Sequence, residues 1–96
     1  MNNQAIKDEL MKKLRYELPV LRARLGISQE KIAEMVGISR QTYNAIETGK
    51  RDMTWPICLS MITFFQNNEQ TAQMLKQLDD FNEDIRRVLS SESIER

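Results

Sequence analysis

Histidine is absent from this sequence of 96 residues, and cysteine occurs once, at Cys58. The chain therefore offers no ordinary set of zinc ligands and no internal disulfide. A glycine-rich phosphate loop is also missing, and without histidine no catalytic constellation can be assembled from the residues present. We expect no metal, no cofactor and no enzymatic activity.

Glycine and proline are scarce, with three and two residues, and runs of alternating β-branched residues are lacking. So few helix breakers favour helices throughout the chain. A hydrophobic share of 41% and a charged share of 29% are typical of folded globular proteins. At this length the chain has room for a single modest core, so we predict one all-α folded unit.

Long apolar runs are missing as well. The longest one, residues 55–65, is about half of the roughly 20 residues that a membrane-spanning helix needs, so we expect a core helix there. Within it, we interpret Cys58 as a small buried hydrophobe rather than a reactive thiol. The N-terminal sequence MNNQAIKDELMKKL places acidic residues where a signal peptide would carry a basic and then an apolar stretch. We therefore expect a cytoplasmic protein without membrane association.

The charges sum to zero but are unevenly distributed. Residues 1–51 carry ten Lys or Arg and six Asp or Glu, a net charge of +4. Residues 52–96 carry four and eight, a net charge of −4. A basic half can meet phosphate groups, while an acidic half faces away from them or meets a protein partner.

The first segment has apolar residues at four-residue steps, which predicts a helix over about residues 4–17 with one apolar stripe. That stripe consists of Ile6, Leu10, Leu14 and Leu18. Proline lacks the amide hydrogen that a helix interior uses, so Pro19 predicts a break near Leu18 and then a short helix that ends at Gly26.

Capping residues divide the rest of the chain into further helices. Ser28, Ser39, Thr54 and Asn68 are the expected N-caps, and Gly37 and Gly49 are the expected ends of the second and third helices. From Phe81 onward we expect a marginal last helix followed by a frayed end. The predicted second to fifth helices cover residues 28–36, 39–48, 54–66 and 69–79.

The stretch AEMVGISRQ, residues 33–41, ends one helix and starts the next within a few residues. Gly37 is best able to adopt the positive φ that ends a helix, and the hydroxyl of Ser39 can cap the following one. Helices joined this tightly must cross at a steep angle. This is the geometry of a helix-turn-helix, whose second helix can enter a DNA groove.

Residues 18–51, LPVLRARLGISQEKIAEMVGISRQTYNAIETGKR, resemble the Cro/Xre family of helix-turn-helix repressors, which includes phage repressors. The resemblance rests on the elements LR, SQEKIA, the glycine turn, SRQTYNAIE and GKR. It implies a five-helix repressor-like DNA-binding domain over residues 18–80. An N-terminal helical extension, residues 1–17, and a short C-terminal helical tail, residues 81–96, would flank this domain.

The same resemblance implies structural roles for four residues. Ala33 would lie where the two helices of the motif cross, since a small side chain lets their backbones approach, and Gly37 would supply the turn. Arg22 and Glu47 would form a partly buried ion pair that ties the first helix of the family domain to the end of the third.

The resemblance also implies which residues meet DNA. Arg40, Gln41 and Asn44 match the base-reading positions of the third helix, where Arg can grip guanine and Gln or Asn can grip adenine. Gln29 would hold a phosphate at the start of the second helix. The other expected phosphate contacts are Thr42, Tyr43, Lys50 and Arg51. For Tyr43 a place in the core comes first, and for Gln29, Lys50 and Arg51 simple solvation is the alternative.

These features predict a sequence-specific DNA-binding transcriptional regulator, a repressor that acts as a homodimer on a two-fold symmetric site in double-stranded DNA. We expect the apolar stripe of the first helix, or the fifth helix with the tail, to supply the dimer interface. The alternative is an antitoxin or adaptor whose main role is to bind a protein partner, with DNA binding for autoregulation. The extra N-terminal helix and the acidic stretch DDFNED, residues 79–84, favour that alternative.

Overall fold

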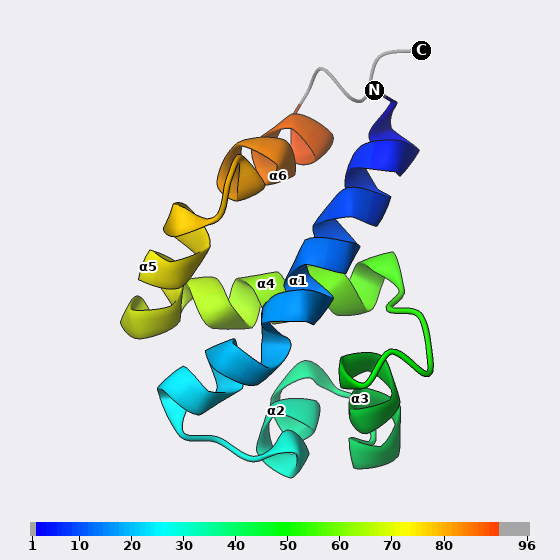
Figure 1. The fold of residues 1–96 in the computed structure, drawn as a ribbon, viewed down its shortest axis with the longest axis vertical. Coiled ribbons are helices and arrows are strands. Elements are labelled where there is room, and N and C mark those ends of the chain that lie inside the picture. Colours follow the sequence, from blue (N-terminus) through cyan, green and yellow to red (C-terminus); the bar gives the residue numbers. More distant parts are fainter. Residues whose placement is uncertain (1, 91–96) are drawn as a thin grey trace.

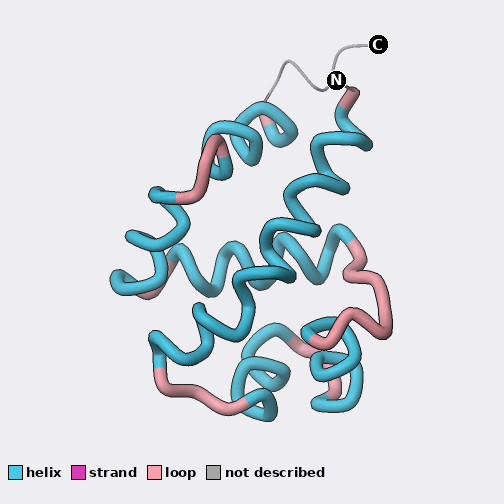
Figure 2. The backbone as a smooth tube through the Cα atoms, viewed as in Figure 1, coloured by secondary structure: helices cyan, strands magenta, loops and turns pink. Residues whose placement is uncertain are grey.

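A computed structural model of the chain describes residues 2–90, and this part contains six helices and no strand (Figures 1 and 2). The prediction of an all-α fold is therefore confirmed. None of these helices is both long and apolar enough to cross a membrane. The helices are α1 (Asn3–Leu25), α2 (Gln29–Val36), α3 (Arg40–Glu47), α4 (Trp55–Gln66), α5 (Glu69–Gln77) and α6 (Phe81–Leu89).

The helix α1 runs without a break through Pro19, so the predicted break near Leu18 is wrong. A proline inside a helix removes one backbone hydrogen bond and costs about 3 kcal/mol. Leu14, Leu18 and Leu21 lie on either side of it and are fully buried. Each such side chain contributes about 1.5 to 3 kcal/mol, enough to offset the proline, whose ring faces solvent.

The core is built around α1, which packs against α3, α4, α5 and α6. In Figure 1, α4 crosses α1 near its middle and α6 runs beside its N-terminal half. The apolar stripe from Ile6 to Leu18 is therefore buried inside the chain's own core, with no member more than 3% exposed. The expectation that this stripe supplies a dimer interface is wrong, because α4, α5 and α6 already cover it.

The apolar helix α4 begins and ends as the sequence predicted. Thr54 caps it, with Oγ1 accepting a hydrogen bond from the amide of Ile57 at 3.4 Å, and Pro56 lies in its first turn. Cys58 is fully buried, as predicted, and burial raises the pKa of its thiol to about 12.

The predicted cap of α5 has a different role. Asn68 precedes the helix, but its side chain makes no capping bond, and its Nδ2 instead donates to the carbonyl of Phe64 at 2.8 Å. The buried Thr71 joins α4 to α5, because its hydroxyl donates to the carbonyl of Phe65 at 2.7 Å. The side-chain amide of Asn68 thus ties the last turn of α4 to the start of α5.

The last helix, α6, is well packed, because Phe81, Ile85 and Val88 turn to the core and are at most 9% exposed. Acidic residues in its first turn and arginines in its last turn match the polarity of the helix dipole. Of the expected frayed end, SSESIER, residues 91–96 lie outside the described residues. The three-part division of the chain stays a prediction, and its first boundary falls inside the unbroken α1.

Candidate nucleic-acid interface

The helices α2 and α3 pack against each other, and serine hydroxyls cap both. Oγ of Ser28 accepts from the amide of Lys31, and Oγ of Ser39 accepts from the amide of Thr42, each at 3.0 Å. Both serines were predicted as caps from the sequence. Each bond satisfies one of the amides that a helix start leaves without an intrahelical partner.

The turn between the two helices forms at Gly37, which has φ +84° as predicted. Its amide donates to the carbonyl of Glu34 at 3.3 Å, and the amide of Ile38 donates to Ala33 at 2.9 Å. This pair of bonds is a Schellman motif, which closes a helix through one left-handed residue. Ala33 is buried beside the turn, 1% exposed, as its expected place at the helix crossing requires.

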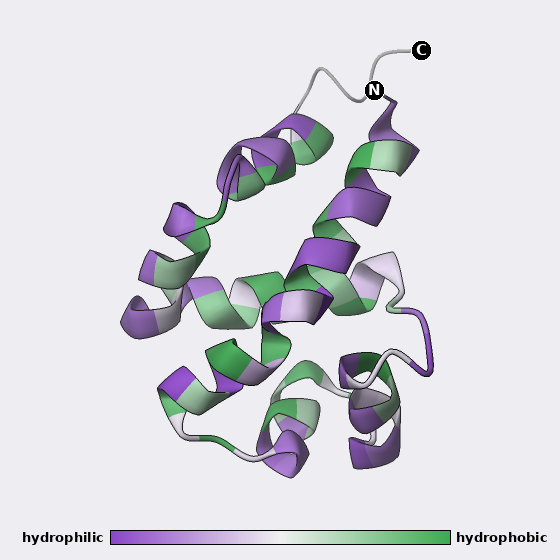
Figure 3. Ribbon diagram, viewed as in Figure 1, coloured by the Kyte–Doolittle hydropathy of each residue, from purple (hydrophilic) through white to green (hydrophobic). Residues whose placement is uncertain are grey.

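The helix α3 turns its apolar residues inward and most of its polar residues outward. Tyr43 and Ile46 are fully buried, whereas Arg40 and Gln41 are exposed and Asn44 is half-buried. In Figure 3 most of the visible ribbon of α3 has the colour of hydrophilic residues. The three expected base readers therefore share one side of the helix, because residues three and four apart are neighbours on its surface.

An open hollow lies beside the N-terminal turn of α3. It has a volume of about 610 Å³. Arg40 and Gln41 line it from α3, and Glu30, Lys31 and Glu34 line it from α2. The two expected readers at the start of α3 are thus accessible from the surface.

A polar network links α1, α2 and α3 around the carboxylate of Glu47. Arg22 donates to it twice, from Nε and Nη2, each at 3.0 Å, which is the ion pair implied by the resemblance. Nε2 of Gln29 donates to Oε1 of Glu47 at 2.9 Å, and the hydroxyl of Tyr43 donates to Oε2. Nδ2 of Asn44 in turn donates to Oε1 of Gln29 at 3.1 Å.

The electrostatics of the network follow from burial and these bonds. Burial by itself would raise the pKa of Glu47, but the hydrogen bonds from Arg22, Tyr43 and Gln29 outweigh it and hold that pKa below its ordinary value. The hydrogen bond to Glu47 raises the pKa of Arg22 against the opposing effect of burial. Both partners are therefore ionised at neutral pH.

Two expected phosphate contacts of α3 already make hydrogen bonds within the protein. Tyr43 lies in the core, the place put first for it, with its hydroxyl proton on Glu47. Burial, and then that hydrogen bond, raises the pKa of Tyr43, so the hydroxyl stays protonated. Oγ1 of Thr42 accepts from the hydroxyl of Ser39 at 2.9 Å and is half-buried. The hydroxyl of Tyr43 is thus used within the protein, whereas Thr42 only accepts a hydrogen bond and keeps its own hydroxyl hydrogen for a further partner.

The turn after α3 carries the remaining expected phosphate contacts. The amides of Lys50 and Arg51 both donate to the carbonyl of Ala45, at 2.8 and 3.1 Å, and both side chains are exposed. A Cβ added to Gly49 would lie 3.1 Å from Nη1 of Arg15, so α1 brings a third basic side chain to this turn. The sequence reasoning missed Arg15, because nothing in the local pattern of α1 indicates which distant turn it meets.

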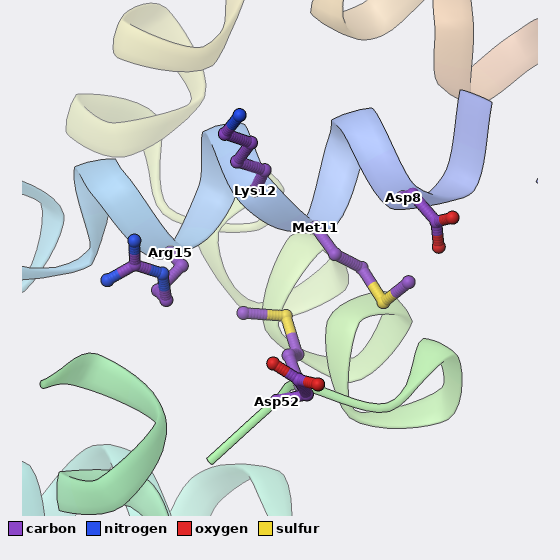
Figure 4. A pocket seen from close by; sticks show the side chains of 6 residues that line it. Asp8, Met11, Lys12, Arg15 and Asp52 are labelled. Carbon is purple, nitrogen blue, oxygen red and sulfur yellow. The ribbon is translucent and has the colours of Figure 1, made fainter. Parts of the chain in front are cut away.

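A groove of about 470 Å³ lies between α1 and the segment that follows this turn (Figure 4). Asp8, Met11 and Arg15 line it from α1, and Asp52 and Met53 line it from the other side. Figure 4 shows Lys12 pointing away from Asp52. The groove combines charges of both signs, so its chemistry does not select an anion or a cation.

Comparison with known proteins gives the class of this site. Residues 20–54 match the family described as Helix-turn-helix, HTH_3, a segment that includes all of α2 and α3. This segment is a helix-turn-helix of the Cro/Xre type, so the resemblance drawn from the sequence is confirmed.

One curated relative is an uncharacterized HTH-type transcriptional regulator, YgzD, from Bacillus subtilis (strain 168). It is 66% identical to this chain over 29 residues, which cover 30% of this chain and 44% of the relative. The match thus spans less than half the length of that relative. No solved structure matched the chain.

Proposed function

We propose that this protein is a sequence-specific DNA-binding transcriptional regulator, a repressor that acts as a homodimer on a two-fold symmetric operator. The observation that carries the proposal is that α3 has one buried face and one exposed polar face. Tyr43 and Ile46 are fully buried, while Arg40 and Gln41 project from its N-terminal turn and Asn44 lies one turn further on. The N-terminal end of the second helix of such a motif is the part that reads bases in the major groove.

The phosphate contacts in this proposal come from three parts of the chain. Gln29 lies at the start of α2, where amide groups and the helix dipole favour an anion. Lys50 and Arg51 follow α3, and Arg15 of α1 reaches the same turn. These basic residues belong to the half of the chain with a net charge of +4. They hold the helix against the DNA backbone without reading sequence.

The proposal is tested by titrating operator and scrambled duplexes at one salt concentration, after the operator has been selected from a random DNA pool. Arg40→Ala is expected to weaken operator binding by about 1 to 3 kcal/mol and scrambled DNA much less, because a lost bidentate base contact affects only the specific complex. Arg86→Ala, which removes an exposed arginine of α6, is the control and should change neither. Equal losses on both duplexes would make Arg40 a phosphate ligand, and no loss on either would exclude α3 as the reading helix.

The homodimer follows from the short reach of α3. One helix end reads only a few base pairs, whereas two copies about 34 Å apart read two half-sites on one face of the duplex. Sedimentation of the free protein and of its operator complex should show two copies on DNA. A single copy in both states would exclude the homodimer.

The alternative role of antitoxin or adaptor gains no specific support. Its two supporting segments contact each other, since α1 packs on α6 and Nζ of Lys13 donates to the carbonyl of Asp79 at 3.1 Å. The buried face of each segment is thus occupied within this chain.

A further inference from the structure

We infer that Gln29 sets the base preference of Asn44, in addition to any phosphate that it holds. This inference rests on the proposed DNA binding and assigns α2 a part in reading sequence. It starts from a chain of hydrogen bonds that runs from a buried carboxylate to a side chain on the reading surface of α3.

The first link is the Glu47 carboxylate, which is ionised and therefore only accepts hydrogen bonds. Its side chain is 8% exposed and is held in place by two bonds from Arg22 and one from Tyr43. A neighbouring amide can approach it favourably only with the nitrogen end. Gln29 does so, with its Nε2 at 2.9 Å from Oε1 of Glu47.

The second link follows from the first. With Nε2 of Gln29 turned to Glu47, its Oε1 is directed to the other side of the amide, where it meets Asn44. An oxygen there can only accept, so Asn44 must also present its nitrogen, and Nδ2 lies at 3.1 Å. The charge of one carboxylate thereby fixes the orientation of two successive amides, which otherwise could each be rotated by a half turn.

The third link is formed by the hydrogen-bonding groups of Asn44 that Gln29 does not use. One of its two amide hydrogens is used by Gln29, so the other hydrogen and the Oδ1 oxygen remain. A donor beside an acceptor is complementary to adenine, which offers N7 as acceptor and the N6 amino group as donor in the major groove. Guanine offers two acceptors, N7 and O6, and fits this edge poorly. The network therefore favours adenine at the base pair that Asn44 meets.

Without Gln29 the Asn44 amide has no partner that distinguishes its two ends. It can then turn, and it presents either edge to the base. The loss is confined to one base pair, whereas a lost phosphate contact weakens all sequences alike. This difference separates a role of Gln29 in orienting Asn44 from a role in phosphate binding alone.

The experiment measures binding of wild type, Gln29→Ala, Asn44→Ala and the double variant to a set of operator duplexes with each half-site base pair replaced in turn. The base pair at which Asn44→Ala abolishes the preference identifies the Asn44 position. There, Gln29→Ala is expected to reduce discrimination about tenfold, and the double variant should lose no more than Asn44→Ala. Gln73→Ala, a matched removal of an exposed glutamine in α5 and outside the candidate interface, should leave that preference intact.

A uniform loss of affinity in Gln29→Ala, with every base preference retained, would overturn the inference and leave Gln29 as a phosphate contact. Circular dichroism of each variant checks that the fold is kept. The hydrogen bond itself is tested without DNA, from the side-chain amide signals of Asn44 in the NMR spectrum of the free protein. In Gln29→Ala these signals should shift and exchange faster with solvent, and unchanged signals would contradict the link.

The two readouts also separate this inference from the proposed function. If wild type selects no sequence from the random pool, the proposed function fails and the reading role of Gln29 fails with it. If wild type binds specifically but Gln29→Ala keeps its preference for each base, only the inference is lost.

Discussion

At the scale of residues, the most consequential side chain is Glu47. It receives hydrogen bonds from Arg22 of α1, Gln29 of α2 and Tyr43 of α3, so one carboxylate joins three helices. Hydrogen bonds to a charged group contribute about 1.5 to 3 kcal/mol each. The relative placement of the two helices that form the candidate interface therefore depends on the ionised state of this residue.

Acid should destabilise the protein through Glu47. Its pKa in the folded state lies below the ordinary value of 4.5, so its contribution is fully present above that value. The contribution is lost as the pH falls from there through the folded pKa. Urea unfolding between pH 7 and pH 3 is expected to show a steeper loss of stability for wild type than for Glu47→Gln.

The variant also tests the ion pair at neutral pH. Glu47→Gln should be less stable by about 3 kcal/mol, because Arg22 then keeps its charge without a counterion. Glu9→Gln, a change at an exposed position of α1, serves as the control and should follow the wild-type curve. Parallel acid profiles for wild type and Glu47→Gln would show that Glu47 does not cause the loss of stability in acid.

Gly37 provides a second prediction at this scale. Its φ of +84° costs a residue with a side chain about 1 to 2 kcal/mol, and a Cβ there would meet no atom within 4 Å. Gly37→Val should therefore lower the melting temperature through backbone strain alone. Gly37→Asn should lower it less, since asparagine tolerates this conformation better. Equal melting temperatures for all three proteins would exclude the strain.

At the scale of elements, α1 combines a weak point with the largest share of the core contacts. Pro19 leaves one helical carbonyl without its usual donor, yet the helix continues for six more residues to Leu25. Leu21 and Arg22, which follow the proline, belong to the core and to the Glu47 network. Tertiary contacts thus add to the backbone bonds that hold the second half of α1 in place.

Replacing Pro19 tests this balance. Pro19→Ala should stabilise the protein by about 2 kcal/mol. The cost of a proline inside a helix, about 3 kcal/mol from the lost hydrogen bond and the clash of its ring with the preceding turn, outweighs the roughly 0.4 to 1 kcal/mol that proline gains by restricting the unfolded chain. The measurement is the urea midpoint at an unchanged slope. Val20→Ala, at the exposed neighbouring position, controls for helix propensity. A lower midpoint for Pro19→Ala would mean that the core requires the geometry that proline imposes.

At the scale of the whole molecule, the two halves of opposite charge form one body with a shared core. The basic half contributes α1 to α3 and the turn with Lys50 and Arg51, and the acidic half contributes α4 to α6. The molecule is elongated, with extents of 40 × 27 × 19 Å, and α2 and α3 lie together at one end (Figure 1). An anionic duplex is attracted to the half that carries the proposed reading helix.

The salt dependence of DNA binding measures this arrangement. Lys50→Ala should weaken binding to all sequences alike and reduce the slope of log K against log salt by about 0.9, the value for one phosphate contact. Lys76→Ala, an exposed lysine of α5 in the acidic half, should leave the slope unchanged. A change in base preference with an unaltered slope would show that Lys50 is not a backbone contact.

The sequence by itself determined the helix-turn-helix, because its signals act over a few residues. Ser28 and Ser39 cap helices through amides three positions on, and the amide of Gly37 closes α2 through carbonyls three and four positions back. Which residues of α3 face inward and which face outward likewise follows from the 3.6-residue period of a helix. These features do not depend on the rest of the chain, so the local sequence pattern was enough to predict the helix-turn-helix.

The tertiary structure decided what depends on residues far apart in the chain. The helix through Pro19 persists because distant helices cover its leucines, and the same covering removes the apolar stripe of α1 from any dimer interface. The bond from Asn44 to Gln29 spans 15 positions. Local periodicity carries no information on which distant side chain completes such a contact, because that depends on how the helices pack.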